Sequence, residues 1–163
     1  DQRHRLVVTG AIATPMTPAA NPWEHLTHGF QVSGVVQYYS ALPFNVVSGV
    51  NSLQGTAGRP FAGGSVSTAN FDVRPVEFIP RNAGTGSNFF SMSLRVSRSF
   101  QIGGGRRVEG LVEAFNLTNH VNAITRNTTF GPGSYPSNPV PAFNTVTAVG
   151  DPRTLQVGVR MTF

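Results

Sequence analysis

The sequence predicts an all-β protein built from antiparallel strands. Apolar and polar residues alternate with a period of two over several segments of about ten residues, which is typical of strands with one apolar face and one polar face. Helical periodicity is nearly absent, and 18 glycines and 12 prolines among 163 residues disfavour helix interiors. The segments between the alternating stretches differ greatly in length, so both tight turns and long loops are expected.

Six strands are predicted along the chain. Their expected ranges are Arg5–Ile12, Phe30–Tyr39, Phe44–Val50, Phe89–Phe100, Arg107–Leu117 and Leu155–Phe163, the first and third having the weaker patterns. In each of the four clearer strands, alternate positions are apolar and the positions between them are largely polar. The apolar positions include Val32, Val36, Met92, Leu94, Val96, Leu155, Val157, Val159 and Met161.

The connections between these strands are predicted to alternate between short and long. Tyr39 is joined to Phe44 by the four residues 40–43, and residues 101–106 contain three consecutive glycines that suit a hairpin turn. The segments 13–29, 51–88 and 118–152 are long. We therefore expect a meander in which each strand pairs with its neighbour in sequence, with short turns at one end and long loops at the other.

This pattern is typical of an outer-membrane β-barrel, in which strands of 9–11 residues cross the bilayer between short turns and long loops. A soluble β-sandwich also has alternating strands and glycine-rich turns. Aromatic residues near the strand ends favour the barrel because they suggest two interfacial girdles. We expect Trp23, Phe30, Phe89, Phe90 and Phe115 on the long-loop side, and Tyr38, Tyr39, Phe44, Phe100 and Phe163 on the short-turn side.

Composition and motifs argue against several functional classes. The net charge of +5 comes from twelve scattered arginines and seven acids, and without a basic stripe no nucleic-acid partner is expected. There is no cysteine for a disulfide or a thiolate site, and no Gly-x-Ser-x-Gly nucleophile motif. His25 and His28 have only Glu24 nearby as a further possible metal ligand, so we read them as polar residues of an exposed loop. We expect no catalytic residue, no bound metal and no cofactor, and thus no enzyme.

The two faces of the predicted strands have different expected environments. The nine apolar residues of the clearer strands would face lipid, and five charged residues would face a barrel lumen. These lumen-facing candidates are Arg95, Arg107, Glu109, Glu113 and Arg160. They either form a structural ladder of cross-strand ion pairs or line a surface that contacts a plug or a solute.

Several segments, in order along nearly the whole chain, resemble the C-terminal end of TonB-dependent receptor β-barrels. The similarity is to the Oar-like receptors that contain a carboxypeptidase regulatory domain. The matching segments are the opening Asp1–Arg5, then Gly34–Val46, Pro80–Gly84, Glu113–Asn122, Asn127–Gly131 and Gly150–Phe163. The closing Phe163 is similar to the terminal aromatic residue that the outer-membrane assembly machinery reads.

The resemblance implies that residues 1–163 form the C-terminal portion of a barrel wall in the outer membrane of a Gram-negative bacterium. Six strands cannot close a barrel, for which eight is the bacterial minimum. The implied partners are outer-membrane lipid, the remainder of the barrel, a plug domain, the TonB system and the assembly machinery. The implied function is uptake of an unidentified solute. The alternatives are a structural or adhesive barrel without uptake, and a soluble β-sandwich binding module.

Overall fold

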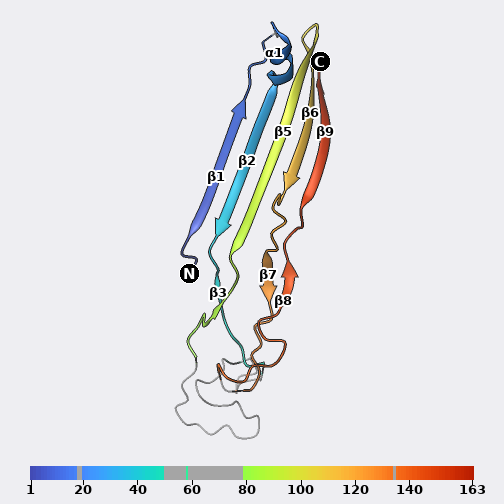
Figure 1. Ribbon diagram of the computed structural model, residues 1–163. Coiled ribbons are helices and arrows are strands. Elements are labelled where there is room, and N and C mark those ends of the chain that lie inside the picture. The colour runs from blue at the N-terminus through green and yellow to red at the C-terminus, as the bar shows by residue number, and fades with distance from the viewer. Residues whose placement is uncertain (18–19, 50–57, 59–78, 134) are drawn as a thin grey trace. The chain divides into compact units, whose positions relative to one another are not determined.

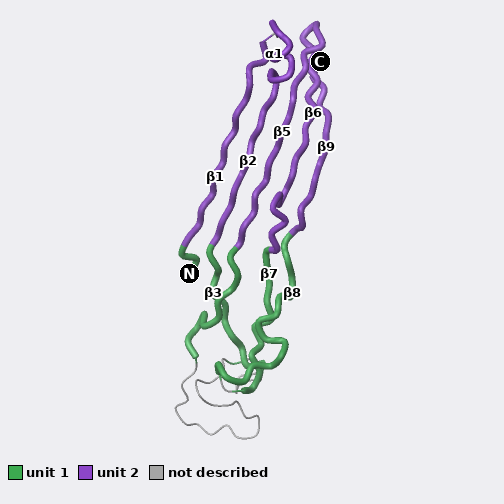
Figure 2. Tube along the Cα trace, in the orientation of Figure 1, with its two compact units in different colours: residues 1–3, 40–88, 122–150 green, residues 4–39, 89–121, 151–163 purple. Residues whose placement is uncertain are grey.

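The computed structural model describes the chain except for residues 18–19, 50–57, 59–78 and 134 (Figure 1). The fold is all-β with antiparallel strands, as the sequence predicts. The chain divides into two compact units (Figure 2). Unit 1 comprises residues 1–3, 40–88 and 122–150, and unit 2 comprises residues 4–39, 89–121 and 151–163.

Unit 2 is a five-stranded antiparallel sheet of long strands (Figure 1). Its strands are β1 (Arg5–Ala13), β2 (Phe30–Tyr39), β5 (Phe89–Gly103), β6 (Arg106–Phe115) and β9 (Thr154–Thr162). They lie in the order β1-β2-β5-β6-β9, so the long strands follow one another across the sheet as they do along the chain. Within this unit the topology is the expected meander.

The register gives the five strands one mainly apolar face and one face that carries most of their charged residues. Directly opposed residues on antiparallel strands share a face. One row of opposed residues is wholly apolar and runs through Ile12, Val32, Val96, Val112 and Val157. The row one position away runs through Ala11, Ser33, Arg95, Glu113 and Gln156. All nine apolar residues expected to share a face do so, and the five charged candidates lie on the other face.

The third predicted strand, over Phe44–Val50, is wrong. The structure has only a two-residue strand there, β3 (Pro43–Phe44), which pairs with β4 (Gly84–Thr85). Val46 instead packs into the core of unit 1, and Val47 forms an isolated parallel bridge with Thr129. Val50, the last residue of the prediction, lies outside the described residues.

The expected hairpin at residues 40–43 is also wrong, and the connections at the two ends of the sheet therefore differ from the prediction. β2 pairs with β1 and β5, so residues 40–88 form one long connection. We call the end of unit 2 at which β2 and β6 finish the loop end, and the opposite end, with the Gly103–Gly105 turn, the turn end. The long segment 14–29 therefore lies at the turn end rather than among the long loops.

The aromatic residues do gather at both ends, but the two groups differ from the prediction. Phe30, Phe100 and Phe163 lie toward the turn end, with Trp23 in the adjoining segment 14–29. Those toward the loop end are Tyr38, Tyr39, Phe89, Phe90 and Phe115. Tyr39 and Phe89 stack there with ring centroids 5.3 Å apart. Phe44 belongs to unit 1.

Segment 14–29 contains one short helix that the sequence reasoning did not anticipate, α1 (Pro22–Thr27). Asn21 caps it, because its side-chain oxygen accepts a hydrogen bond of 3.0 Å from the backbone of Glu24. Proline at the first helical position and glutamate at the third complete a recognisable start signal. No helix among the described residues is long and apolar enough to cross a membrane.

Unit 1 has its own small core and two short ribbons. β3 pairs with β4, and β7 (Ala123–Arg126) pairs with β8 (Val146–Val149). Val46, Ile79 and Phe130 are almost fully buried, with Phe44, Ala83, Tyr135 and Phe143 packed around them. The connection between β2 and β5 and the connection between β6 and β9 therefore contribute to one apolar cluster.

Asn116 and Asn119 tie the end of β6 to the start of β9 within unit 2. The Asn116 amide donates 3.0 Å hydrogen bonds to the carbonyls of His120 and Asp151, and its oxygen accepts one from the His120 backbone. Asn119 accepts a hydrogen bond from the backbone of Arg153. Both asparagines have positive φ, of 46° and 53°, a conformation that asparagine tolerates better than most residues.

Replacing Asn116 with alanine should destabilise the protein by about 1–3 kcal/mol, because three buried hydrogen bonds are lost. Urea unfolding of the full-length protein, followed by circular dichroism, measures this change. Thr118→Ala is the matched control: it removes the same Asn-x-Thr sequence at an exposed side chain and should shift stability by less than about 0.5 kcal/mol. Equal effects of the two substitutions would contradict the tie.

Candidate functional site

The candidate site is a cluster of charged side chains on the polar face of unit 2. We call Arg95, Arg107, Glu109, Glu113 and Arg160 the polar-face cluster. β5 contributes the first, β6 the next three, and β9 the last. Because alternate residues of a strand point to the same face, odd-numbered positions of β5 and β6 share this face, as do even-numbered positions of β9.

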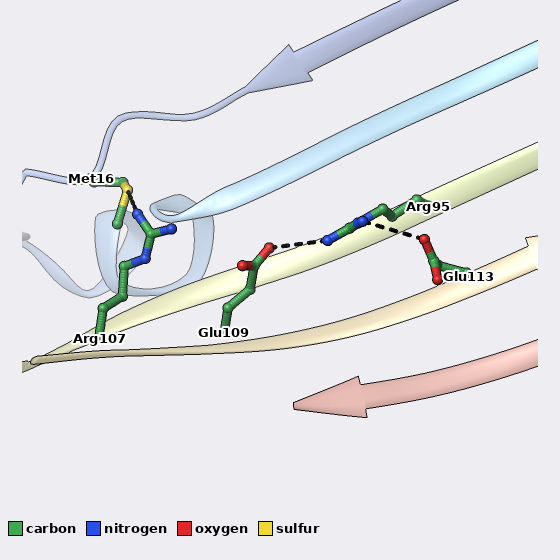
Figure 3. Close-up of polar contacts among 5 residues, drawn as sticks. All are labelled: Met16, Arg95, Arg107, Glu109 and Glu113. Atoms are coloured by element: carbon green, nitrogen blue, oxygen red, sulfur yellow. Dashed lines mark hydrogen bonds and ion pairs between the residues drawn. The ribbon is translucent and has the colours of Figure 1, made fainter. Parts of the chain in front are cut away.

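Arg95 lies between the two glutamates of β6 and contacts both (Figure 3). Its Nη1 is 3.4 Å from Oε1 of Glu113, and its Nη2 is 3.7 Å from Oε1 of Glu109. Glu113 is the residue directly opposite Arg95, whereas Glu109 lies four positions away along β6. One guanidinium therefore contacts the carboxylates of two residues whose backbones lie about 13 Å apart along β6.

Burial differs strongly among these three side chains. The Glu109 side chain is only 9% exposed, whereas that of Arg95 is 42% exposed. An exposed ion pair contributes about 0–1 kcal/mol, so neither contact is a strong source of stability. A nearly buried carboxylate without a partner is much more costly. The main role of Arg95 in this structure is thus to supply a cation to Glu109.

The remaining two arginines make no ion pair with these glutamates in the described part of the chain. Arg107 directs its Nη1 toward the sulfur of Met16, at 3.8 Å (Figure 3). Arg160 is directly opposite Glu109 in the register and is exposed, yet the two side chains are not within 4.0 Å of each other. Cross-strand ion pairs therefore join Arg95 to Glu109 and Glu113, while Arg160 stays accessible.

Two shallow cavities open on this face, and Arg95 lines both. The larger, of about 530 Å³, is lined by Arg95 and Glu113 and reaches β1 at Thr9. The smaller, of about 360 Å³, is lined by four cluster members, including Glu109 and Arg160. The cluster's three cations and two anions leave an excess positive charge, so it can bind polar or anionic groups through charge-assisted hydrogen bonds.

The other sequence-derived sites are separate from this cluster. His25 lies in α1 and His28 just beyond it, where the His28 ring is 3.0 Å from the carbonyl oxygen of Thr17. Among the described residues, no group of three or more histidine, cysteine or acidic side chains could hold a metal ion. Phe163 follows β9 and is 91% exposed.

Sequence reasoning missed Arg98, which lies on the apolar face rather than the polar one. Its register partners are Phe30 and Gly110. The signal was present in the sequence, because Arg98 is in phase with Leu94 and Val96 and interrupts their apolar series. An arginine in an otherwise apolar row requires a specific environment.

Comparison with known families gives one match. A family model described as an outer membrane β-barrel domain matches residues 1–156. No curated protein and no solved structure matches the chain. The family match covers all of the first four strands of unit 2 and the start of the fifth.

Replacing Arg95 with glutamine should destabilise the protein by about 1–3 kcal/mol, because the nearly buried Glu109 loses its cation. Arg160→Gln removes a cation from the same face without breaking an ion pair and should cost less than about 0.5 kcal/mol. Urea unfolding of the full-length protein in lipid vesicles measures both. A loss on Arg160→Gln as large as that on Arg95→Gln would disprove the special role of Arg95.

Proposed function

The chain belongs to the outer membrane β-barrel domain family, and on this premise we propose that its sheet is part of the wall of a receptor for TonB-linked solute uptake. The family places the protein in the outer membrane, which removes the soluble β-sandwich from consideration. The uptake role, the link to TonB and the relation to Oar-like receptors belong to the proposal.

The observation that supports the wall assignment best is the separation of the two faces across five consecutive strands. The row through Ile12, Val32 and Val157 is apolar, whereas the adjacent row contains Arg95 and Glu113. A barrel wall needs lipid-compatible residues outside and tolerates charge inside. We assign the apolar face to lipid and the polar-face cluster to the lumen.

The connections suggest how the wall is oriented. Outer-membrane barrels have short turns on the periplasmic side and longer loops outside the cell. β5 and β6 are joined by a tight glycine turn at the turn end, whereas residues 40–88 and 116–153 leave from the loop end. We assign the turn end to the periplasm and the loop end to the extracellular side.

Uptake is favoured by the ordered resemblance to TonB-dependent receptors and by the polar-face cluster. A charged surface with two shallow cavities suits contact with a plug domain or a passing solute. The proposed partners are the remainder of the barrel, a plug domain and, through them, the TonB system. Lipid would contact the opposite face.

Phe163 is proposed as the signal that the outer-membrane assembly machinery reads. It is 91% exposed and directly follows β9, an edge strand of the described sheet. A side chain with this exposure is accessible to a recognition partner before the barrel closes.

A structural or adhesive barrel is the second candidate, and unit 1 is the observation that favours it. Residues from both long connections fold into a compact unit with its own buried core around Phe130. Loops that only admit a solute need no shared core, whereas an adhesive surface requires a defined shape. The two functions differ in their dependence on energy.

If the protein takes up a solute, deleting its gene should abolish an energy-dependent transport activity. Wild-type and deletion strains would be grown on a defined mixture of iron chelates, peptides and oligosaccharides, with depletion followed by mass spectrometry. The wild type should deplete at least one solute faster, and a protonophore should abolish that difference because TonB-linked uptake uses the proton gradient. Equal depletion of every solute, with reduced surface attachment of the deletion strain, would support the adhesive candidate instead.

Deleting Phe163 from the full-length protein should slow membrane insertion, whereas Phe163→Tyr should not, because the aromatic ring is kept. Pulse-labelling followed by the heat-dependent gel shift of folded barrels measures insertion kinetics. If Phe163 is merely an interfacial anchor, deletion will slightly lower stability but leave the insertion rate unchanged, and the signal assignment would be wrong.

A further inference from the structure

Arg98 is a cation on the apolar face of the sheet, near the turn end. It lies directly opposite Phe30 and Gly110 and shares its face with Val96 and Phe100. An arginine facing lipid costs about 2–4 kcal/mol at the bilayer midplane and about 0–1 kcal/mol near the interface. Its position is therefore tolerable only if the guanidinium reaches the headgroup region.

The surroundings of Arg98 hold its guanidinium in place. The guanidinium carbon lies 4.8 Å from the ring centroid of Phe30 and 4.8 Å from that of Phe100. Cation–π contacts of this kind are strongest when water is excluded. Its Nη2 donates to the carbonyl of His25 in α1. The described residues offer no hydrogen-bond partner to its buried Nε, so the described groups use only part of its donor capacity.

α1, whose His25 carbonyl accepts a hydrogen bond from Arg98, carries two exposed apolar side chains. Trp23 is 77% exposed and Leu26 is 61% exposed, and their spacing of three places them on the same side of the helix. Tryptophan is enriched at membrane interfaces, where its ring meets headgroups and its N–H stays near water. The hydrogen bond from Arg98 to His25 brings the last turn of α1 to the edge of the apolar face.

The charges around this position favour an anion. Arg98 and Arg106 are the two cations of segment 98–107 that are not on the polar face, and the one acid of segment 14–29 is Glu24. The two carboxylate oxygens of Glu24 already accept hydrogen bonds from the backbone of Ala20 and the side chain of Asn21. A cavity of about 490 Å³ lies next to Arg98 and is also lined by His25, His28 and Phe100.

We propose that Arg98 and this cavity bind the phosphate of a phospholipid headgroup, with Trp23 and Leu26 inserted into the same interface. Arginine suits this ligand because its planar group donates two parallel hydrogen bonds to phosphate oxygens. Arg98 and Arg106 favour an anionic headgroup such as phosphatidylglycerol. The inference rests on the proposed assignment of the apolar face to lipid and goes beyond the uptake function.

Native mass spectrometry of the detergent-solubilised full-length protein, titrated with dioleoylphosphatidylglycerol, tests the site. Arg98→Gln should raise the Kd of the tightest-bound lipid about fivefold, the effect of one surface cation on an anionic lipid. Arg98→Lys should have a smaller effect because it keeps the charge but loses the planar donor pair. Arg107→Gln, near the same end but on the opposite face, is the matched control and should leave Kd unchanged.

Three results would overturn the proposal. The first is an unchanged Kd in an Arg98→Gln protein that still shows the heat-dependent gel shift of a folded barrel. The second is equal weakening by Arg107→Gln. The third is competition by inorganic phosphate as effective as competition by the lipid, which would make the ligand a free anion. None of these readouts depends on uptake, so failure here leaves the uptake proposal to its own test.

Trp23 provides an independent measurement of the same arrangement. The fluorescence of Trp23 is obtained as the difference between the wild type and Trp23→Phe. In vesicles that contain the full-length protein, phosphatidylglycerol brominated close to the headgroup should quench this component. Quenching of that component by aqueous acrylamide alone would put α1 in water and contradict its place in the interface.

Discussion

Backbone hydrogen bonding between neighbouring strands is the constraint on which the rest of this structure depends. In the hydrocarbon region of a bilayer, unpaired N–H and C=O groups have no water to bind. Long strands must therefore pair with their neighbours, and β1, β2, β5, β6 and β9 each pair antiparallel with the strand or strands beside them in the described sheet. Continuous pairing fixes the register, and the register in turn fixes which face each side chain occupies.

The register explains both the candidate site and its one exception. The register of β5 and β6 places Arg95 directly opposite Glu113, and Arg95 forms a second ion pair with Glu109 on the same face. Arg98, three positions further along β5, necessarily projects from the other face. Two phenylalanine rings and a helix carbonyl hold it there. The same alternation that places Arg95 on the polar face thus places Arg98 on the apolar face.

Five of the six strands and both faces could be predicted from the sequence because a two-residue period spans each of them. The sequence Phe44–Val50 has a similar alternation but does not form a long strand. There the apolar Val46 packs into the core of unit 1 with Phe130. Periodicity cannot reveal which strands pair, so the hairpin at residues 40–43 was assigned wrongly. For the same reason, half of the girdle residues were placed wrongly: Trp23, Phe30, Tyr38 and Tyr39 lie at the opposite end, and Phe44 belongs to unit 1. α1 is too short for a helical period, although Asn21, Pro22 and Glu24 form a start signal. The contacts of Arg95 with both glutamates could not be predicted from the sequence, because they depend on the strand register and on side-chain conformations.

The proposal that the apolar face of the sheet meets lipid and the polar face does not is tested most directly by two adjacent residues of β9. Val157 belongs to the apolar row and Gln156 to the polar row. The measurement is the unfolding free energy of the full-length barrel in vesicles, with arginine at each position in turn. Val157→Arg should cost about 2–4 kcal/mol, whereas Gln156→Arg should cost little. Equal destabilisation by the two substitutions would contradict the assignment of the faces.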